Sequence, residues 1–199
     1  MTQKDLEARI AHLEDYRDIC NLQGRYNHYI LSNRYDKILD MFSKKDPGVR
    51  VELADSGEYK GFEGVMTLFK ILGEKYKFAG GLALHMLMTP VVEVARDGQT
   101  ARGMWHSFGC NTIQTEDGLV AMWQSGKYDI EFTKEEGKWK YRVFKWYVIF
   151  RTPFDKGWVK MPIIGSLTHE GQPPVSPIYA PYDPAQDGQF LPLPPEPEE

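Results

Sequence analysis

Cysteine is scarce in this sequence: among 199 residues there are two, Cys20 and Cys110. Two thiols so far apart, in unlike surroundings, form neither a disulfide framework nor a cysteine metal site. This usage is typical of proteins from a reducing compartment. We therefore expect a cytoplasmic protein.

Clusters of basic residues and long apolar runs are also missing. The formal net charge is −4, and Lys44-Lys45 is too short to form a basic patch. These features predict no nucleic-acid partner. No stretch approaches the ~18 apolar residues of a membrane span, and the polar start Met1 to Asp5 lacks the apolar core of a signal peptide. We expect no membrane attachment.

The usual metal and cofactor motifs are absent as well. The five histidines show neither HxH nor HExxH spacing, and they are His12, His28, His85, His106 and His169. Phosphate-binding loops, dinucleotide fingerprints and a Gly-x-Ser-x-Gly nucleophile motif are not found. The sequence predicts no metal and no cofactor.

The chain is nevertheless rich in core-forming residues, with 42% hydrophobic and 13% aromatic content. Apolar residues recur at three- and four-residue steps over 4–31, which predicts a long amphipathic helix. A short helix is expected over 35–42 and another over 62–72. Between them, residues 49–53 alternate as a half-buried strand does.

From Leu82 onward the hydrophobic period becomes two, which predicts strands over 82–95, 99–114, 119–133 and 138–151. The breaks between them end in an acidic residue and glycine, as hairpin turns do. Strands this long indicate a strongly bent meander, with Gly103 and Gly109 as candidate kinks. Helices followed by such a sheet predict an α+β cone.

The composition changes after Arg151, since 11 of the 13 prolines lie between Pro153 and Pro197. Proline-rich chain cannot pair as a central strand and runs extended. This segment still carries apolar and aromatic residues. We therefore expect a domain over 1–152 and a C-terminal arm over 153–199 that packs on the domain or on a partner subunit.

Three stretches resemble one known family. The first stretch, residues 22–26 followed by 35–39, is similar to the family's first helix and to the aromatic-Asp pair that begins its second helix. The second, residues 59–65, is similar to the glycine-containing loop that leads into the family's third helix. The third, residues 85–92, is similar to the strand that carries the family's histidine. The order resembles the SnoaL-like branch of the nuclear transport factor 2 superfamily, which includes scytalone dehydratase and bile acid 7α-dehydratase. The resemblance covers roughly 5–152 and implies a cone-shaped, curved antiparallel sheet packed on N-terminal helices, the cystatin-like α+β barrel.

One departure from the family pattern concerns its catalytic aspartate. In the dehydratases this Asp follows the helix-one tyrosine by five residues and pairs with the histidine. Five residues after Tyr26 the sequence has Leu31, and Asp36 corresponds to a structural aspartate of the second helix. The resemblance therefore carries over only Tyr26 and His85.

His85 and Tyr26 are the candidate catalytic residues. Imidazole titrates near neutral pH, so His85 can act as a general acid or base among its apolar neighbours. The alternative is a half-buried histidine bonded to a backbone carbonyl. Tyr26 could donate a hydrogen bond to a carbonyl or enolate oxygen, or it could be a core aromatic residue.

Candidate substrate-binding residues surround this pair. Tyr29 lies one helical turn from Tyr26. Either Asn111 or His106 could supply the polar group that replaces the missing Asp. Trp105 and Trp146 are candidates for the walls of the pocket. Core packing is the competing role for each tryptophan. Asp129 and Glu131 share a strand face, as solvated acids do, and Asp55 could reach the pocket mouth.

The leading hypothesis is a cofactor-independent lyase or isomerase that moves a proton in a small apolar, aromatic or polycyclic carbonyl compound. The alternative is a non-catalytic small-molecule-binding or dimeric scaffold protein of the same fold. Aromatic residues of the sheet, including Trp123, Trp139 and Tyr147, also predict a homodimer through its outer face.

Overall fold

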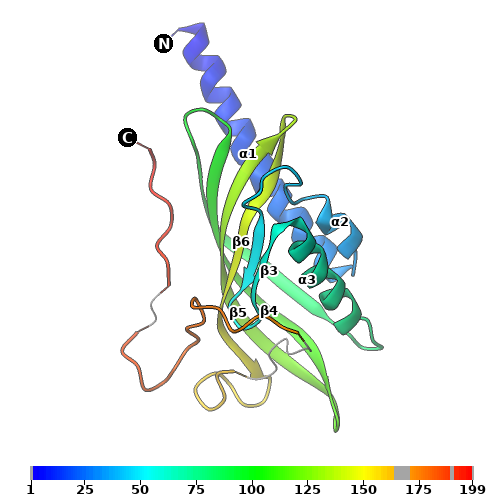
Figure 1. The fold of residues 1–199 in the computed structure, drawn as a ribbon. Helices are drawn as coiled ribbons and strands as arrows, with labels where there is room; N and C mark the ends of the chain where they lie inside the picture. The colour runs from blue at the N-terminus through cyan, green and yellow to red at the C-terminus, as the bar shows by residue number, and fades with distance from the viewer. Residues whose placement is uncertain (1, 164–170, 189–190, 199) are drawn as a thin grey trace.

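A computed structural model describes residues 2–163, 171–188 and 191–198. The chain forms three helices and six strands in the described part, and Figure 1 shows the helices packed on one face of a long, curved sheet. Their bounds are α1 (Gln3–Leu31), α2 (Tyr35–Leu39), β1 (Arg50–Leu53), β2 (Gly57–Lys60), α3 (Gly61–Lys75), β3 (Ala83–Val94), β4 (Thr100–Thr115), β5 (Gly118–Glu135) and β6 (Lys138–Pro153). His169 lies outside the described residues.

The sheet has the order β2-β1-β6-β5-β4-β3 and does not close into a barrel. Three consecutive antiparallel hairpins join β3 to β6, as the acidic-glycine turns predict. The expected α+β architecture is confirmed, and the four long strands lie within three residues of their predicted bounds.

Three local features differ from the sequence expectations. Residues 57–60 form β2, a strand that the periodicity missed because four residues show too short an alternation. The second helix ends at Leu39 rather than at residue 42. β1 pairs in parallel with β6, so the sheet is mixed rather than purely antiparallel.

Bulges and glycines bend the long strands. The register between β3 and β4 shifts between Met88 and Val91, where Thr89 takes a φ of 49°. A Cβ on Gly109 would lie 1.9 Å from the carbonyl oxygen of Leu84. Only glycine therefore permits this close approach of β4 to β3.

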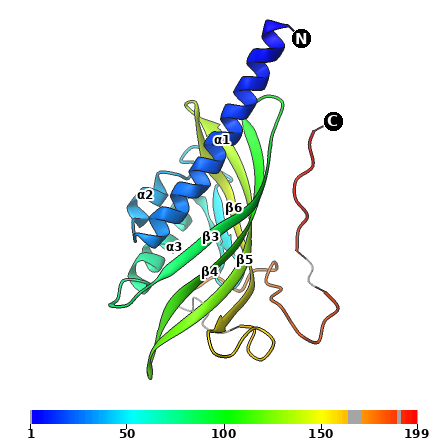
Figure 2. The same ribbon diagram turned by 180° about the vertical axis from the view of Figure 1, so that it is seen from behind.

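Helix α1 begins with a capping box, in which the Thr2 hydroxyl accepts from the Asp5 amide and the Asp5 carboxylate accepts from the Thr2 amide. Its C-terminal half packs on the inner face of the sheet, where Ile19 is fully buried. Its N-terminal part extends beyond the end of the sheet (Figures 1 and 2). None of the described helices is long and apolar enough to cross a membrane.

The core lies between the helices and the inner face of the sheet. Tyr26 of α1 packs against the rings of Phe69, Tyr128, Tyr141 and Phe144, with centroid distances of 4.9–6.3 Å. Such edge-on and tilted aromatic pairs add to the area that burial removes from water.

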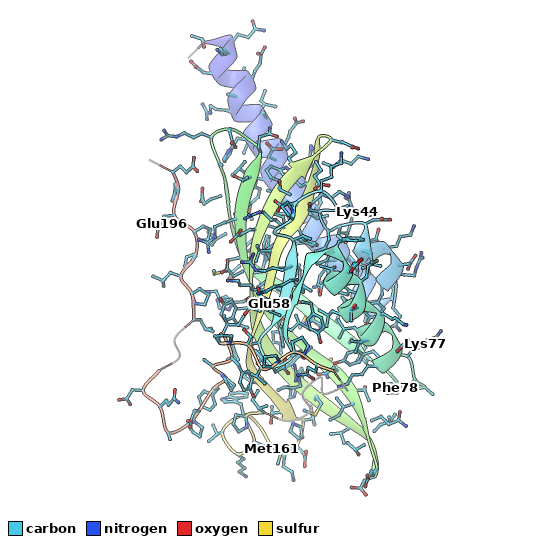
Figure 3. All side chains as sticks on the ribbon, viewed as in Figure 1. Lys44, Glu58, Lys77, Phe78, Met161 and Glu196 are labelled. Carbon is cyan, nitrogen blue, oxygen red and sulfur yellow. The ribbon has the colours of Figure 1, made fainter. Side chains whose placement is uncertain are left out.

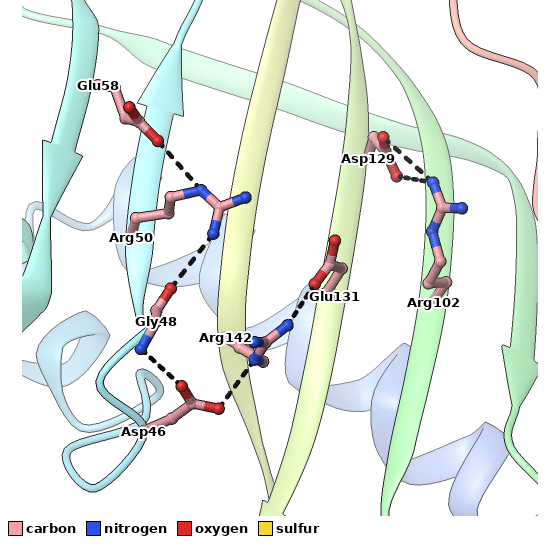
Figure 4. A network of polar contacts seen from close by, with 8 residues as sticks. All are labelled: Asp46, Gly48, Arg50, Glu58, Arg102, Asp129, Glu131 and Arg142. Atoms are coloured by element: carbon pink, nitrogen blue, oxygen red, sulfur yellow. Dashed lines mark hydrogen bonds and ion pairs between the residues drawn. The ribbon is translucent and has the colours of Figure 1, made fainter.

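The outer face of the sheet carries a ladder of charges instead (Figure 4). Arg142 of β6 donates to Asp46 and to Glu131, both at 2.8 Å. Arg102 of β4 donates to Asp129 at 3.1 Å. Asp129 and Glu131 thus belong to ion pairs on the face opposite the helices, but Asp129 is buried beneath its partner rather than solvated as expected.

The described parts of the C-terminal arm touch their own chain. The Ser176 amide donates to the Ala54 carbonyl at 3.1 Å, and the Tyr182 amide donates to the Ile149 carbonyl at 2.7 Å. Figure 3 shows Met161 beyond the end of the sheet. Glu196 lies on the last part of the arm, to the side of the sheet (Figure 3). Contacts of the arm with a partner subunit stay a prediction.

Candidate active site

A small cavity of ≈ 60 Å³ lies between the helices and the inner face of the sheet. It is lined by aromatic and aliphatic side chains together with one histidine, one amide and one guanidinium. The lining residues are Tyr26, Ile30, Tyr35, Leu53, Leu72, Tyr76, His85, Gln124, Tyr128, Trp146 and Arg151. An apolar cavity with a few convergent polar groups is the usual form of a ligand site.

His85 reaches the cavity from the start of β3. It lies opposite Gly109 in the register, and its backbone carbonyl accepts a hydrogen bond from the side-chain amide of Asn27 in α1. Side chains alternate across a strand, so Ala83, His85 and Leu87 face inward. The helix and the neighbouring strand thus fix the imidazole at the cavity wall.

Two side chains hold the imidazole ring. Nε2 of His85 lies 2.9 Å from Nε2 of Gln124, and Nδ1 lies 3.4 Å from the hydroxyl of Tyr128. A carboxamide can donate or accept, and so can a hydroxyl, so both tautomers of the ring find partners here. In the described part of the chain, the ring has an amide and a phenol as partners rather than a carboxylate.

Burial lowers the pKa of His85 from 6.5 to about 4, and the positive charge of Arg151 adds to this effect. The imidazole is therefore neutral at physiological pH and keeps a lone pair for a proton. A neutral ring is the form that a general base requires.

Tyr26 is linked to His85 through Tyr128. The Tyr26 hydroxyl is hydrogen-bonded to the Tyr128 hydroxyl, and burial raises the pKa of both phenols well above the usual value. The Tyr128 oxygen has two lone pairs, so it can accept from Tyr26 and also from an Nδ1–H of His85, which leaves the lone pair on Nε2. The hydroxyl next to the imidazole is therefore that of Tyr128, while Tyr26 orients it.

Arg151 of β6 places a cation in the cavity wall. It donates to Asp55 at 2.7 Å, with 5% and 2% of the two side chains exposed, and its guanidinium lies 5.7 Å from the Trp146 ring centroid. A buried charge requires such a partner. Because Asp55 neutralises Arg151 and His85 is uncharged, the cavity carries no net charge.

A bulge allows Trp146 and Arg151 to face the same cavity. They are five positions apart on β6, so a regular strand would point them to opposite faces. The register with β5 shifts between Ser125 and Gly126, which turns both inward. The Trp146 indole then lies over Gly126, where a Cβ would come within 2.5 Å of the ring.

The other predicted site residues lie away from this cavity. Trp105 is buried and packs edge-on against Phe132 at 6.2 Å. His106 is exposed on the outer face, and Tyr29 lines a separate surface groove beside α2. Their roles in substrate binding stay predictions.

Asn111 is a special case among them. It faces inward on β4, is 3% exposed, and neither polar atom of its side chain has a hydrogen-bond partner among the described residues. A buried amide without partners is costly. Asn111 therefore keeps unused hydrogen-bonding capacity on the inner face of the sheet.

Sequence reasoning missed Gln124, Tyr128 and Arg151 as site residues. Gln124 and Tyr128 share one face of β5, which an alternation count from Trp123 could have found. Arg151 could not be placed without the bulge. No group of three or more His, Cys, Asp or Glu side chains that could hold a metal is found in the described residues.

Comparison with known proteins places this site in context. The SnoaL-like domain family matches residues 11–145. The structure is similar to a hexachlorocyclohexane dehydrochlorinase (LinA, type 2), with a TM-score of 0.62 and 16% identity over 73% of this chain and 93% of that one. No curated protein matches the sequence.

Two further structures are similar to this chain. A scytalone dehydratase-like protein from Novosphingobium aromaticivorans has a TM-score of 0.60 and 14% identity, over 79% of this chain and 97% of that one. A type 3 LinA dehydrochlorinase from Novosphingobium barchaimii has a TM-score of 0.60 and 15% identity, over 73% and 94%. At these identities the likeness concerns the fold.

Proposed function

The chain belongs to the SnoaL-like domain family, and from this premise we propose that it is a cofactor-independent lyase or isomerase acting on a small apolar or aromatic carbonyl compound. The observation that carries the proposal is the neutral His85, held between Gln124 and Tyr128 at the wall of an apolar cavity that also contains Arg151. The structural relatives named as a dehydrochlorinase and a dehydratase-like protein have names that denote eliminations.

In the first step, His85 removes a proton from the carbon next to the substrate carbonyl. The imidazole lone pair forms the new N–H bond, and the C–H electron pair moves into an enolate. Nε2 becomes available when the substrate displaces the Gln124 amide, while Tyr128 holds Nδ1. The low basicity of a ring with a pKa of about 4 restricts the reaction to acidic carbon acids or to sites where the new negative charge is stabilised.

Arg151 supplies that stabilisation. Its cation lies in the cavity wall and raises the free energy of protonated His85. An enolate oxygen beside Arg151 pairs with the guanidinium and simultaneously removes the repulsion of the imidazolium. The fixed ion pair with Asp55 keeps the guanidinium in place, so little reorganisation accompanies charge development.

The second step decides between the two reaction classes. In an elimination, the enolate electrons form a C=C bond, the group on the next carbon leaves with its bonding electrons, and the imidazolium protonates it. In an isomerisation, the imidazolium returns the proton to another carbon of the same conjugated system. Both steps leave His85 neutral and require no cofactor.

The size of the cavity bears on the substrate. Its ≈ 60 Å³ is well below the 300–1,000 Å³ of typical ligand pockets. A compact ring enters with small side-chain shifts, whereas a polycyclic compound requires Tyr35, Leu72 and Tyr76 to move away from the sheet. These three side chains come from the helical side and its following loop, so we propose that substrate enters there.

The second candidate function is non-catalytic binding in the same cavity, in a monomer or in a homodimer formed through the sheet. The amide partner of His85 favours it, because Gln124 cannot raise the basicity of the ring as a carboxylate does. The presence of Arg151 next to a neutral imidazole favours the enzyme.

Solvent exchange separates the two functions. We would incubate 2-tetralone, a bicyclic ketone with acidic α-protons, with the protein in D₂O and follow loss of the α-proton signal by NMR. Exchange faster than in buffer, reduced about 100-fold or more in His85→Gln, supports the enzyme. The matched control is His28→Gln, an exposed histidine of α1, which should exchange as the wild type does.

Binding without exchange contradicts the catalytic proposal. Quenching of Trp146 fluorescence measures binding independently, because the indole lines the cavity. If the ketone quenches Trp146 but no exchange above buffer occurs, the cavity is a binding site. If His85→Gln exchanges at the wild-type rate, another base acts.

A further inference from the structure

The N-terminal part of α1 has an apolar side that is exposed to solvent. Every residue from Thr2 to Glu14 is exposed, and this part of the helix extends past the sheet (Figures 1 and 2). Yet it presents Leu6, Ile10 and Leu13 to solvent, with 45%, 48% and 66% of their surfaces exposed. Residues 2–10 also precede the part of the chain that the family match covers.

The three apolar residues form one stripe. Their spacing of four and then three places Leu6 and Leu13 at d positions and Ile10 at the a position of a heptad. Leucine at d with a β-branched residue at a favours two-stranded, parallel coiled coils. A solvent-facing helix has no use for this pattern.

The charges that flank the stripe fit the same geometry. Arg9 occupies a g position and Glu14 the next e position, five residues on. In a parallel pair of helices these are the residues that meet across the interface, g of one helix with e of the other. In an antiparallel pair, the e positions of one helix meet the e positions of the other. Glu7 and Glu14 of one helix would then face the same residues of the second helix, and the like charges would repel.

The helix is held rigidly where it leaves the domain. Asp15 accepts from Lys134 at 2.7 Å and from the Trp139 indole at 2.8 Å, so α1 is tied to the β5–β6 hairpin. Nine positions separate Leu6 from Asp15, which is two and a half turns at about 3.6 residues per turn. The stripe thus faces away from the side that α1 turns to the sheet.

We propose that residues 3–14 of α1 pair in parallel with the same segment of a second copy of this chain. Leu6, Ile10 and Leu13 then meet their counterparts across a two-fold axis, and two Arg9–Glu14 ion pairs flank the seam. The helix is already folded, capped and anchored in the single chain. Association therefore does not have to offset the entropy lost in forming the helix. The contact is short, so it assists dimerisation without needing a large interface.

A lipid surface fits the segment less well. Membrane-bound amphipathic helices carry Lys and Arg along the polar face, whereas one flank of this stripe carries Glu7 and Glu14. The pairing is independent of the chemistry proposed for His85, since the cavity lies at the other end of α1. Failure of either proposal leaves the other standing.

Light scattering after size exclusion tests the pairing on the full chain. The wild type should have at least twice the 23.0 kDa mass of one chain. Leu13→Glu should halve the observed mass or weaken self-association by about tenfold or more, because the seam would bury carboxylates. The matched control is Ala8→Glu, which puts the same charge on the other side of the helix and should keep the wild-type mass.

Cross-linking tests the orientation. In a background with Cys20→Ala and Cys110→Ala, Leu6→Cys should form an intermolecular disulfide under mild oxidation, because identical d positions meet in a parallel pair. Ala8→Cys should not. Arg9→Glu should weaken self-association, and Arg9→Glu with Glu14→Arg should restore it.

Three results overturn the proposal. These are a monomeric wild type at its highest soluble concentration, a Leu13→Glu variant with the wild-type mass, and equal cross-linking of the Leu6→Cys and Ala8→Cys variants. Circular dichroism checks that the variants fold. Leu6, Ala8, Arg9, Leu13 and Glu14 are all exposed, so their substitution should not change the spectrum. Vesicle binding by the wild type that Leu13→Glu abolishes, without a change of mass, also overturns it in favour of a lipid partner.

Discussion

At the scale of single residues, the environment of His85 determines what the site can do. The sequence places an ordinary histidine among apolar neighbours, and the fold surrounds its ring with a cavity wall, an amide and a nearby cation. Both burial and Arg151 disfavour the protonated form. The ring is thus a weak base whose usefulness depends on the charge that a substrate develops beside Arg151.

The depressed pKa makes stability depend on pH. In the unfolded chain His85 takes up a proton near pH 6.5, but in the folded protein only near pH 4. The unfolded state therefore binds more protons between these values, and acid favours unfolding there. We expect this group's contribution, up to about 3 kcal/mol, to be fully present above pH 6.5 and lost as the pH falls towards 4.

Denaturant unfolding at several pH values between 4 and 7 measures this loss, and NMR of the His85 ring gives its pKa directly. The His85→Gln variant should lack the His85 part of the pH dependence. A wild-type ring that titrates near 6.5 would contradict the expectation, and so would equal pH profiles for the two proteins.

Gln124→Glu should restore basicity to the ring. A carboxylate 2.9 Å from Nε2 favours imidazolium and raises the pKa of His85 by one unit or more, roughly the effect of one close opposite charge. Ring NMR of the variant checks the direction. Gln124→Met removes the amide without adding charge and should leave the pKa low.

At the scale of elements, two glycines have opposite roles. Gly109 in β4 lies so close to Leu84 that a Cβ would come within 1.9 Å of its carbonyl oxygen, whereas a Cβ on Gly24 in α1 meets nothing within 4 Å. Glycine in a helix interior is unfavourable relative to alanine, but glycine at a tight strand contact is required.

We therefore expect Gly109→Ala to lower the free energy of unfolding by at least about 2 kcal/mol, because β4 must move away from β3. Gly24→Ala should raise it by about 0.5–1 kcal/mol through helix propensity. Urea unfolding of both variants provides the comparison. An unchanged midpoint for Gly109→Ala would mean that the strands can separate without cost.

At the scale of the whole molecule, the buried Arg151–Asp55 pair joins distant parts of the chain. Asp55 follows β1, Arg151 lies near the end of β6, and Gln172 of the arm donates to the Asp55 backbone carbonyl at 3.4 Å. The Arg151 amide also donates to the Pro162 carbonyl at 2.8 Å. The pair and these backbone contacts thus join β1, β6 and the arm.

Asp55→Asn should destabilise the protein by about 3–5 kcal/mol, because it leaves the Arg151 cation buried without its counter-charge. Thermal and urea unfolding measure the change. The control is Asp129→Asn, whose partner Arg102 is half exposed, and which should cost about 1 kcal/mol or less. Equal effects in the two variants would mean that water reaches Arg151.

Much of the fold could be predicted from local patterns. Period-two alternation and acidic-glycine turns identified four long strands, and three- and four-residue steps identified α1, because each pattern reflects the burial of one face of an element. β2 and the parallel pairing of β1 with β6 could not be predicted. One is too short to show a period, and the other joins segments about ninety residues apart in the sequence.

The site was only partly predictable for the same reason. His85, Tyr26 and Trp146 were selected from the sequence and line one cavity. Gln124 and Tyr128 required the strand register, and Arg151 required a bulge that no local pattern marks. A single extra residue in a strand reverses the face of every side chain beyond it.

The sequence by itself therefore determined the helices, the long strands, their order and the residue types available for chemistry. Hydrophobic periodicity and turn residues act within a few positions of the chain, so they can be read without the fold. The tertiary structure decided which polar groups meet His85, why its imidazole stays neutral, and that Asp55 balances Arg151. These properties arise from burial and from contacts between distant segments, which exist only once the sheet has curved around the helices.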